Sequence, residues 1–141
     1  MILDLMNEKK VYRNILDFGA GRAEIFRETL EKRALQVKCI DKEEIIDLRW
    51  KFDVVVCASV LEFTNLPVTL KLIKSVIAPN GMIVASSPMN TWASRLYFKL
   101  IKDKNSRNTH QDILKEAAKH FFIIEQKEWF GLYFAFKGYP K

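Results

Sequence analysis

The stretch DFGAG, residues 17–21, combines residue types that suit a ligand-binding loop. Asp17 supplies a negative charge, and Gly19 and Gly21 stand on either side of a single alanine. Glycine has no Cβ atom, so a backbone that contains it can pass close to a ligand and adopt conformations that other residues avoid. The stretch follows an apolar run and precedes a helical pattern, which is where open α/β sheets bind their ligands. We therefore expect the backbone of this loop and the Asp17 carboxylate to form part of a binding site.

Small or acidic residues end three further apolar runs of the chain. They are Asp41, the pair Ala58 and Ser59, and the pair Ser86 and Ser87. Because the carboxyl ends of parallel strands meet at one edge of a sheet, these residues are expected to gather around the DFGAG loop. The sequence thus predicts one site built from four strand ends.

The pattern argues against a phosphate-containing ligand. A dinucleotide-binding loop has the form G-x-G-x-x-G, and Glu24 stands at the position of its third glycine. A carboxylate there would occupy the helix N-terminus that a pyrophosphate needs. A P-loop is excluded as well, because the sequence contains no G-K-[ST] triplet. One acid at the start of the loop and a second acid, Asp41, after the next strand instead suit a ligand with an amino group and a ribose diol.

Hydrophobic periodicity predicts the elements that must position these residues. Apolar and β-branched runs predict strands over residues 11–18, 36–40, 52–59, 82–87, 121–126 and 132–136. Helical patterns occupy residues 22–35, 66–77, 92–103 and 111–120. Asn65 is the expected N-cap of the second helix, and Thr109 with Asp112 forms a capping box before the fourth. The segment APNG, residues 78–81, is expected to be a turn.

The order of these elements predicts an α/β fold. Strands alternate with helices until the end, which indicates a Rossmann-like, doubly wound, mostly parallel sheet with helices on both faces. The run FDVVVCAS (52–59) is too continuously apolar for a half-exposed strand, as expected for a sheet covered on both sides. The link 127–131 is too short to cross over to a parallel neighbour, so the last two strands form a C-terminal antiparallel hairpin. We expect a single domain over residues 1–141.

The composition is that of a water-soluble globular chain. Of its 141 residues, 49% are hydrophobic and 28% are charged, and no run approaches the roughly 18 apolar residues of a membrane span. The N-terminal MILDLMNEKK lacks the basic segment and cleavage site of a secretory signal. Cys39 and Cys57 lie in strand-like runs without metal-ligand spacing. We therefore expect reduced core cysteines, no metal and a cytoplasmic location.

Four segments of the chain follow one another in an order that is typical of one enzyme family. ILDFGAGRAEIF (15–26) has the form acid-x-G-x-G-x-G, with Ala23 in place of the third glycine, and CIDKEE (39–44) brings an acid to the next strand end. FDVVVCASVLEF (52–63) and IKSVIAPNGMIVASSP (73–88) provide two further strand segments. Together they resemble the class I S-adenosylmethionine-dependent methyltransferases, in a compact form of the small-molecule branch. The resemblance covers nearly the whole chain.

The resemblance implies that S-adenosyl-L-methionine is the cofactor. Gly19 and Gly21 would let the backbone approach its amino-acid tail, and Asp17 would help to orient that loop. Asp41 would accept hydrogen bonds from the ribose diol, while Ala58 and Ser59 would border the adenine and methionine parts. The full set of expected cofactor-binding residues is Asp17, Phe18, Gly19, Ala20, Gly21, Asp41, Lys42, Ala58, Ser59 and Val60.

Two departures from the family pattern affect this site. Only ten residues separate Asp41 from Phe52, too few for the helix and third strand that the family places there, so this region is shortened. The wall that the third strand normally gives to adenine is then expected from Ile45, Ile46 or Asp47. In addition, few residues precede the first strand, where relatives carry lid helices. The site is therefore open, or another subunit closes it in a homo-oligomer.

Catalytic residues are less clearly marked than the cofactor loop. The expected reaction is an in-line displacement of an activated methyl group, in which the protein aligns the reactants and keeps the site dry. A general base is needed only for a protonated acceptor. His110 is the candidate, although a solvated residue of a first helical turn is the alternative, and His120 is expected at a helix end. Glu62 is either structural or faces the substrate, and Phe63 replaces a histidine of the family.

The helix 92–103 is expected to decide the choice of substrate. Its apolar stripe, with Trp92 and Leu96, is expected opposite Arg95, Lys99 and Lys102, and the segment 95–107 carries a net charge of about +4 by its residue types. Three interpretations remain open: a core-packed helix with a solvated basic face, a helix that docks a lipid-like substrate at a membrane surface, or a segment that guides RNA. We favour a small-molecule acceptor. The alternative is a domain of the same fold that binds the cofactor or a partner without catalysis.

Overall fold

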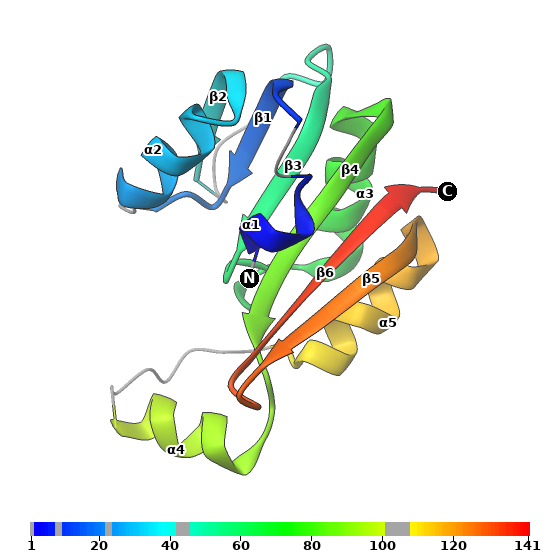
Figure 1. The fold of residues 1–141 in the computed structure, drawn as a ribbon. Helices are drawn as coiled ribbons and strands as arrows, with labels where there is room; N and C mark the ends of the chain where they lie inside the picture. The colour runs from blue at the N-terminus through cyan, green and yellow to red at the C-terminus, as the bar shows by residue number, and fades with distance from the viewer. Residues whose placement is uncertain (1, 8–9, 22–23, 42–45, 101–107) are drawn as a thin grey trace.

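The computed structural model describes residues 2–7, 10–21, 24–41, 46–100 and 108–141 (Figure 1). Its strands are β1 (Tyr12–Phe18), β2 (Ala34–Ile40), β3 (Phe52–Ala58), β4 (Ile77–Pro88), β5 (Phe121–Trp129) and β6 (Tyr133–Pro140). Its helices are α1 (Ile2–Leu5), α2 (Glu24–Glu31), α3 (Leu66–Val76), α4 (Trp92–Leu100) and α5 (His110–His120), with a 3-10 turn η1 at Leu61–Phe63.

One mixed sheet organises the described chain, in the strand order β2-β1-β3-β4-β6-β5. The first four strands of this order are parallel, and β6 pairs antiparallel with both β4 and β5. The prediction of a mostly parallel sheet with a C-terminal antiparallel hairpin is confirmed. From β1 the chain passes to β2 on one side and then returns to β3 on the other, so the strand order reverses between β1 and β3. Open α/β sheets bind ligands at such a point.

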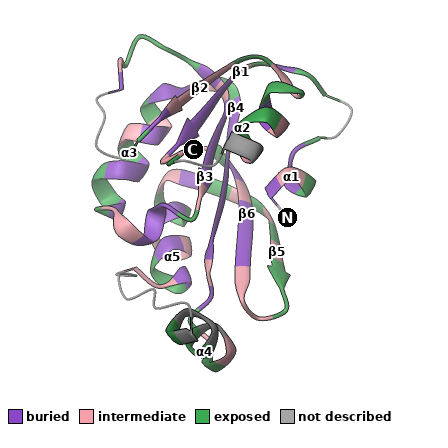
Figure 2. Ribbon diagram, turned by 90° about the vertical axis from the view of Figure 1, so that its left-hand side faces the viewer, coloured by how far each residue is buried: buried purple, intermediate pink, exposed green. Residues whose placement is uncertain are grey.

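Helices cover both faces of the sheet, as predicted. Figure 2 shows α3 and α5 on one face and α1 and α2 on the other. Along β3 the side chains alternate between the two cores: Val55 and Cys57 pack with α3 and α5, whereas Val54 and Val56 pack with α1 and α2. Both sets are fully buried, which explains the unbroken apolar run of this strand.

The two predicted helix caps are confirmed. The Asn65 side chain accepts a hydrogen bond from the backbone N–H of Val68 at the start of α3. At the start of α5, the Thr109 hydroxyl accepts a bond from the backbone of Asp112, whose carboxylate accepts one from the backbone of Thr109. These local signals fix where each helix begins.

Several predicted boundaries were wrong where sheet pairing outweighs local patterns. The first predicted helix ends at Glu31 rather than at residue 35, because Ala34 already pairs with Tyr12. The hairpin strands also run further than predicted and leave only residues 130–132 between them. The short helix α1, which packs against β4 and β6, was not predicted.

The predicted turn at residues 78–81 lies inside β4. Phe52 of β3 pairs with Ile77, but Val54 pairs with Met82, so the register shifts and β4 carries the extra residues as a bulge. Proline and glycine weaken regular pairing in strands and are common at bulges. Pro79 and Gly81 therefore do mark an irregular stretch of backbone, as predicted, but this stretch lies inside β4 instead of before it.

The two cysteines are free thiols of the sheet. Cys57 is buried in β3, and burial raises the pKa of its thiol well above the usual range, whereas Cys39 in β2 is half-buried. Among the described residues, no group of three or more histidine, cysteine or acidic side chains is arranged to hold a metal ion. Within the same residues, no helix has the length and apolarity that crossing a membrane requires.

Candidate functional site

The loop after β1 is fixed to the end of β2. The backbone N–H groups of Gly19 and Ala20 both donate to the carbonyl oxygen of Ile40, at 2.8 and 3.2 Å. Phe18, which begins the loop, is buried in the core beside Ile40. The loop is thus held by two hydrogen bonds and an apolar anchor, and Asp41 follows directly after the residue that accepts both bonds.

The two glycines of the loop have different structural roles. Both have positive φ, +77° at Gly19 and +55° at Gly21, which side chains rarely adopt. A Cβ on Gly19 would lie 2.3 Å from Cγ2 of Val60, so glycine lets the loop pack directly on that side chain. A Cβ on Gly21 would meet no described atom within 4 Å. Gly21 therefore leaves a bare stretch of backbone beside open space, where a ligand can approach.

Asp17 is a buried carboxylate at the carboxyl end of β1. It is 2% exposed and pairs in register with Cys39 of β2 and Val56 of β3. Burial raises its pKa to about 6, and no described cation offsets that effect. Burial removes water from an anion, and a nearby cation favours its ionised form. The site is therefore prepared for a positively charged group.

Asp41 is exposed one residue beyond the end of β2. Because Ile40 accepts the two hydrogen bonds of the glycine loop, Asp41 stands next to that loop rather than at a distance from it. Two carboxylates, one buried and one exposed, therefore lie at the ends of neighbouring strands. Lys42, also expected in the site, lies outside the described residues.

The third strand end of the site has a strained backbone. Ser59 follows β3 with a φ of +52°, and its N–H donates to the carbonyl oxygen of Ser86 at 2.9 Å. A positive φ in a residue other than glycine costs roughly 1–2 kcal/mol, and such strain gathers at functional sites. Ala58 is half-buried, Ser59 is exposed, and Val60 is buried beneath Gly19. The predicted residues of β1, β2 and β3 are thus brought together.

The three residues proposed for the adenine wall have different surroundings. Ile46 is buried in the core that contains residues of α3 and α5, so its side chain belongs to that core. Asp47 accepts hydrogen bonds from the Arg49 side chain, with a shortest distance of 2.7 Å. Ile45 lies outside the described residues. The source of the wall remains a prediction.

His110 begins α5 and is held by the chain that follows β4. Its Nδ1 accepts a hydrogen bond from the backbone N–H of Asn90 at 2.9 Å, and its ring packs on Phe134. Burial lowers its pKa, and the Glu128 carboxylate opposes that shift. A neutral imidazole that accepts at Nδ1 carries its proton on Nε2. The ring therefore presents a donor, and the lone pair that a general base requires is already used.

Glu62 is buried beneath the end of β4. Its carboxylate accepts a hydrogen bond from the Ser87 hydroxyl at 3.0 Å, and its carbonyl oxygen accepts one from the Asn108 backbone. These contacts join η1 to the end of β4 and to the residue before the cap of α5, which favours a structural role. His120 ends α5, with Nε2 3.5 Å from the Glu116 carboxylate, as expected for a residue at a helix end.

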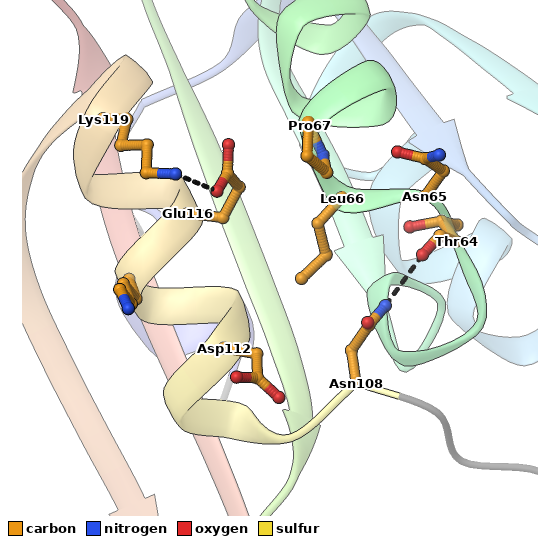
Figure 3. Close-up of a pocket in the computed structure, with 9 residues that line it drawn as sticks. Thr64, Asn65, Leu66, Pro67, Asn108, Asp112, Glu116 and Lys119 are labelled. Atoms are coloured by element: carbon orange, nitrogen blue, oxygen red, sulfur yellow. Dashed lines mark hydrogen bonds and ion pairs between the residues drawn. The ribbon is translucent and has the colours of Figure 1, made fainter.

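A groove of about 470 Å³ lies between α3 and α5 (Figure 3). None of the predicted cofactor residues lines it. Several of its polar side chains have partners: Asn108 donates to the carbonyl oxygens of Leu61 and Thr64, and Lys119 pairs with Glu116. Asp112 caps α5. The groove is therefore a polar junction that joins two helices, and the candidate site is at the strand ends.

The interpretation of the helix after β4 as a core-packed element was wrong for Trp92 and Leu96, the two residues of the expected apolar stripe whose side chains are described. Trp92 and Leu96 of α4 are mostly exposed. Figure 1 shows α4 extending beyond the carboxyl end of β4, away from the sheet. The rest of the predicted helix, from residue 101 to 103, lies outside the described residues. Hydrophobic periodicity locates an apolar face but does not say what covers it.

Sequence reasoning missed the backbone partners of the site. The carbonyl of Ile40 and the N–H of Asn90 each bind a predicted residue, but their side chains carry no such signal. The strained φ of Ser59 was also missed, because serine is not typical of that conformation.

Comparison with known proteins relates most of the chain to one family of enzymes. The chain matches the model of a family described as methyltransferase domain over residues 2–118. A search of curated proteins finds no match. Many solved structures are similar, and the identities of those given next are low enough to carry the fold alone.

Two of these structures are of the N-methyltransferase NodS from Bradyrhizobium japonicum WM9. The first has a TM-score of 0.73 at 15% identity and covers 99% of this chain and 93% of that one. The second, in complex with S-adenosyl-L-homocysteine, has a TM-score of 0.75 at 14% identity, with 99% and 83% covered. Human N-acetylserotonin methyltransferase, in complex with S-adenosylmethionine, has a TM-score of 0.72 at 14% identity, with 99% of this chain and 50% of that chain covered.

Alanine substitutions at the two glycines are expected to have different consequences. Gly19→Ala should destabilise the fold by about 3 kcal/mol, because it adds a clash with Val60 to an unfavourable φ. Gly21→Ala should cost only about 1 kcal/mol, because its Cβ meets open space. Urea unfolding measures both. Equal losses for the two variants would contradict the assigned packing.

Asp17→Asn is expected to stabilise the ligand-free protein at neutral pH. The folded pKa of about 6 lies above the unfolded value of 3.8, so the folded state binds more protons between these values and stability falls as pH rises through this window. The full effect, about 1–3 kcal/mol, is present above pH 6 and is gone below about pH 4. Urea unfolding at several pH values measures it. A variant that is less stable than the wild type at pH 8 would overturn the assignment.

Proposed function

The chain belongs to the methyltransferase-domain family of S-adenosylmethionine-dependent enzymes, and from this premise we propose that it transfers the methyl group to a small-molecule acceptor by in-line displacement. The family and the fold that the motifs predicted are confirmed. The acceptor, the displacement geometry and the role of each residue are proposals.

The observation that carries the proposal is the buried, uncompensated carboxylate of Asp17. The amino-acid tail of S-adenosylmethionine carries an ammonium group, and such a cation would relieve the unfavourable burial of this anion. The residues next to Asp17 fit the rest of the tail, because Gly21 leaves backbone exposed to open space. We assign the ammonium group to the neighbourhood of Asp17 and the tail to the bare side of the loop.

Asp41 fits the ribose of the same cofactor. It is exposed beside the loop, and the two oxygens of a carboxylate can accept hydrogen bonds from both hydroxyls of a diol. Ala58 and the strained Ser59, at the end of the next strand, are the residues we assign to the opposite side of the site.

When bound, the cofactor supplies a methyl group that its sulfonium already activates. The chain then has to align the acceptor and exclude water. We propose that His110 positions the segment after β4 by accepting from Asn90, and that its Nε2–H is available as a donor to the acceptor molecule. A base is needed only if the acceptor is protonated, and this arrangement suits an acceptor whose lone pair is already free.

A small-molecule acceptor is supported by the kinds of relative that share the fold. The names of the similar structures include an N-methyltransferase and an enzyme that acts on N-acetylserotonin. These substrates belong to those proteins. For this chain, these names favour a small-molecule acceptor, whose identity has to be found by experiment.

Calorimetric titration with S-adenosyl-L-homocysteine tests the cofactor site. Wild-type protein should bind it, and Asp41→Ala should weaken binding about tenfold or more, which corresponds to about 1.4 kcal/mol. Asp41→Asn should fall between the two, because one acceptor oxygen remains. Glu31→Gln, which removes an exposed acid that pairs with Arg27 on α2, is the matched control and should bind like the wild type.

Two results would count against the assignment. Asp41→Ala binding as tightly as the wild type would remove the ribose role of Asp41. A folded wild-type protein that does not bind would contradict the cofactor site itself.

A further inference from the structure

Four large apolar side chains project into solvent at one end of the molecule. They belong to α4 and to the tip of the β5–β6 hairpin, where Trp129 ends β5 and Phe130 begins the turn. We call them the aromatic rim: Trp92, Leu96, Trp129 and Phe130. Trp92 is 77% exposed and Phe130 is 83% exposed, while the other two are about half exposed. Large exposed apolar groups that gather in one place mark interaction surfaces, whereas single ones need no explanation.

Hydrogen bonds join the two elements of the aromatic rim. The Thr91 hydroxyl donates a hydrogen bond to the carbonyl oxygen of Gly131 at 2.6 Å. The backbone N–H of Met89 donates one to the carbonyl oxygen of Leu132 at 2.8 Å. Trp92 directly follows Thr91, and Phe130 directly precedes Gly131. Trp92 and Phe130 therefore start from neighbouring stretches of backbone, and the ring of Trp129 packs edge-on against that of Phe130, with centroids 5.1 Å apart.

The conformation of the turn does not explain why phenylalanine stands at its tip. Phe130 and Gly131 have φ values of +49° and +64°, and the N–H of Leu132 bonds to Trp129 across the turn. Two successive positive φ values define a tight hairpin turn that favours asparagine or glycine. Phenylalanine is unfavourable at such a φ, and it stays mostly exposed although its ring packs edge-on against Trp129. Such an outlier is a reason to look for a function.

Cations share the exposed face of α4 with the apolar groups. Trp92, Arg95, Leu96 and Lys99 follow the spacing i, i+3, i+4, i+7, which places them on one side of a helix. All four are exposed. They therefore lie together, and the expectation of opposite faces was wrong for these residues. The helix contains no acidic residue. The surface is a mixture of aromatic, aliphatic and positively charged groups.

We propose that the aromatic rim, with Arg95 and Lys99, docks the protein on an anionic lipid surface. Tryptophan and phenylalanine enter the boundary between headgroups and acyl chains, and arginine and lysine bind lipid phosphates at the same depth. The cations match the negative charge of such a membrane. Figure 1 shows α4 and the β5–β6 turn beyond the carboxyl end of β4, so docking would turn this end of the sheet toward the bilayer.

A lipid surface fits these residues better than the other occupants. In a symmetric pair of chains joined through this face, both copies of α4 would bring Arg95 and Lys99 and no acidic residue to the interface, which repulsion between like charges opposes. Single-stranded RNA is bound in positively charged grooves with stacking platforms, whereas the aromatic rim protrudes. The proposal does not depend on methyl transfer, because it rests on a surface outside the cofactor site.

Vesicle sedimentation tests the docking surface directly. The full chain is mixed with vesicles of phosphatidylcholine alone, or with about a third of phosphatidylserine, near physiological salt. We expect binding to the anionic vesicles to be at least tenfold stronger than to the neutral ones. Trp92→Ala and Phe130→Asn should each weaken it several-fold, and the double variant Arg95→Gln with Lys99→Gln should remove the preference for anionic lipid.

The controls separate loss of docking from loss of folding. Phe130→Asn suits a positive φ, so its thermal midpoint should be no lower than that of the wild type. Phe122→Ala removes an aromatic side chain that is similarly exposed but lies on the edge strand β5, and it should bind vesicles normally.

Three results would overturn the proposal. One is equal or absent binding to both kinds of vesicle. Another is self-association of the free protein that the same variants abolish. The last is stronger binding to a single-stranded RNA homopolymer that Phe130→Asn weakens.

Discussion

The burial of the Asp17 carboxylate is the interaction on which the site depends. A charged group at the end of a central parallel strand is surrounded by β2 and β3 and loses its water, while the described residues give it no cation in return. The fold tolerates this loss because the packing around it is extensive. In the proposed function, the positive charge of the ligand offsets this loss.

The glycine loop, which begins next to this carboxylate, is held in place by contacts with two neighbouring strand ends. Gly19 is held by Ile40 on one side and packs on Val60 on the other, so the ends of β1, β2 and β3 are joined through one residue. Gly21, two residues later, makes no such contact. In the connection between β2 and β3, Ile46 is buried in the core that also contains residues of α3 and α5. The described residues of the candidate site thus come from the ends of β1, β2 and β3.

Much of the fold was predictable because its signals are local. Apolar runs, the Asn65 cap and the Thr109–Asp112 box each specify a structure within a few residues, and the order of elements then limits the topology. The cofactor residues were located for the same reason, and their individual roles remain predictions. The predictions that were wrong or incomplete concern features that depend on residues distant in the sequence. Sheet pairing turned residues 78–81 into a bulge, and exposure of Trp92 depends on where α4 leaves the sheet. The use of the His110 lone pair depends on a backbone group twenty residues away.

The central claim is that the ionised Asp17 carboxylate holds the ammonium group of the cofactor. The most direct measurement is the dissociation constant of S-adenosyl-L-homocysteine from pH 7.5 to pH 5, for the wild type and for Asp17→Asn. Because the carboxyl becomes protonated below about pH 6, the wild type should lose about tenfold in affinity between pH 7 and pH 5, whereas the variant should bind weakly at every pH. Wild-type affinity that does not change over this range, or tight binding by Asp17→Asn, would contradict the account.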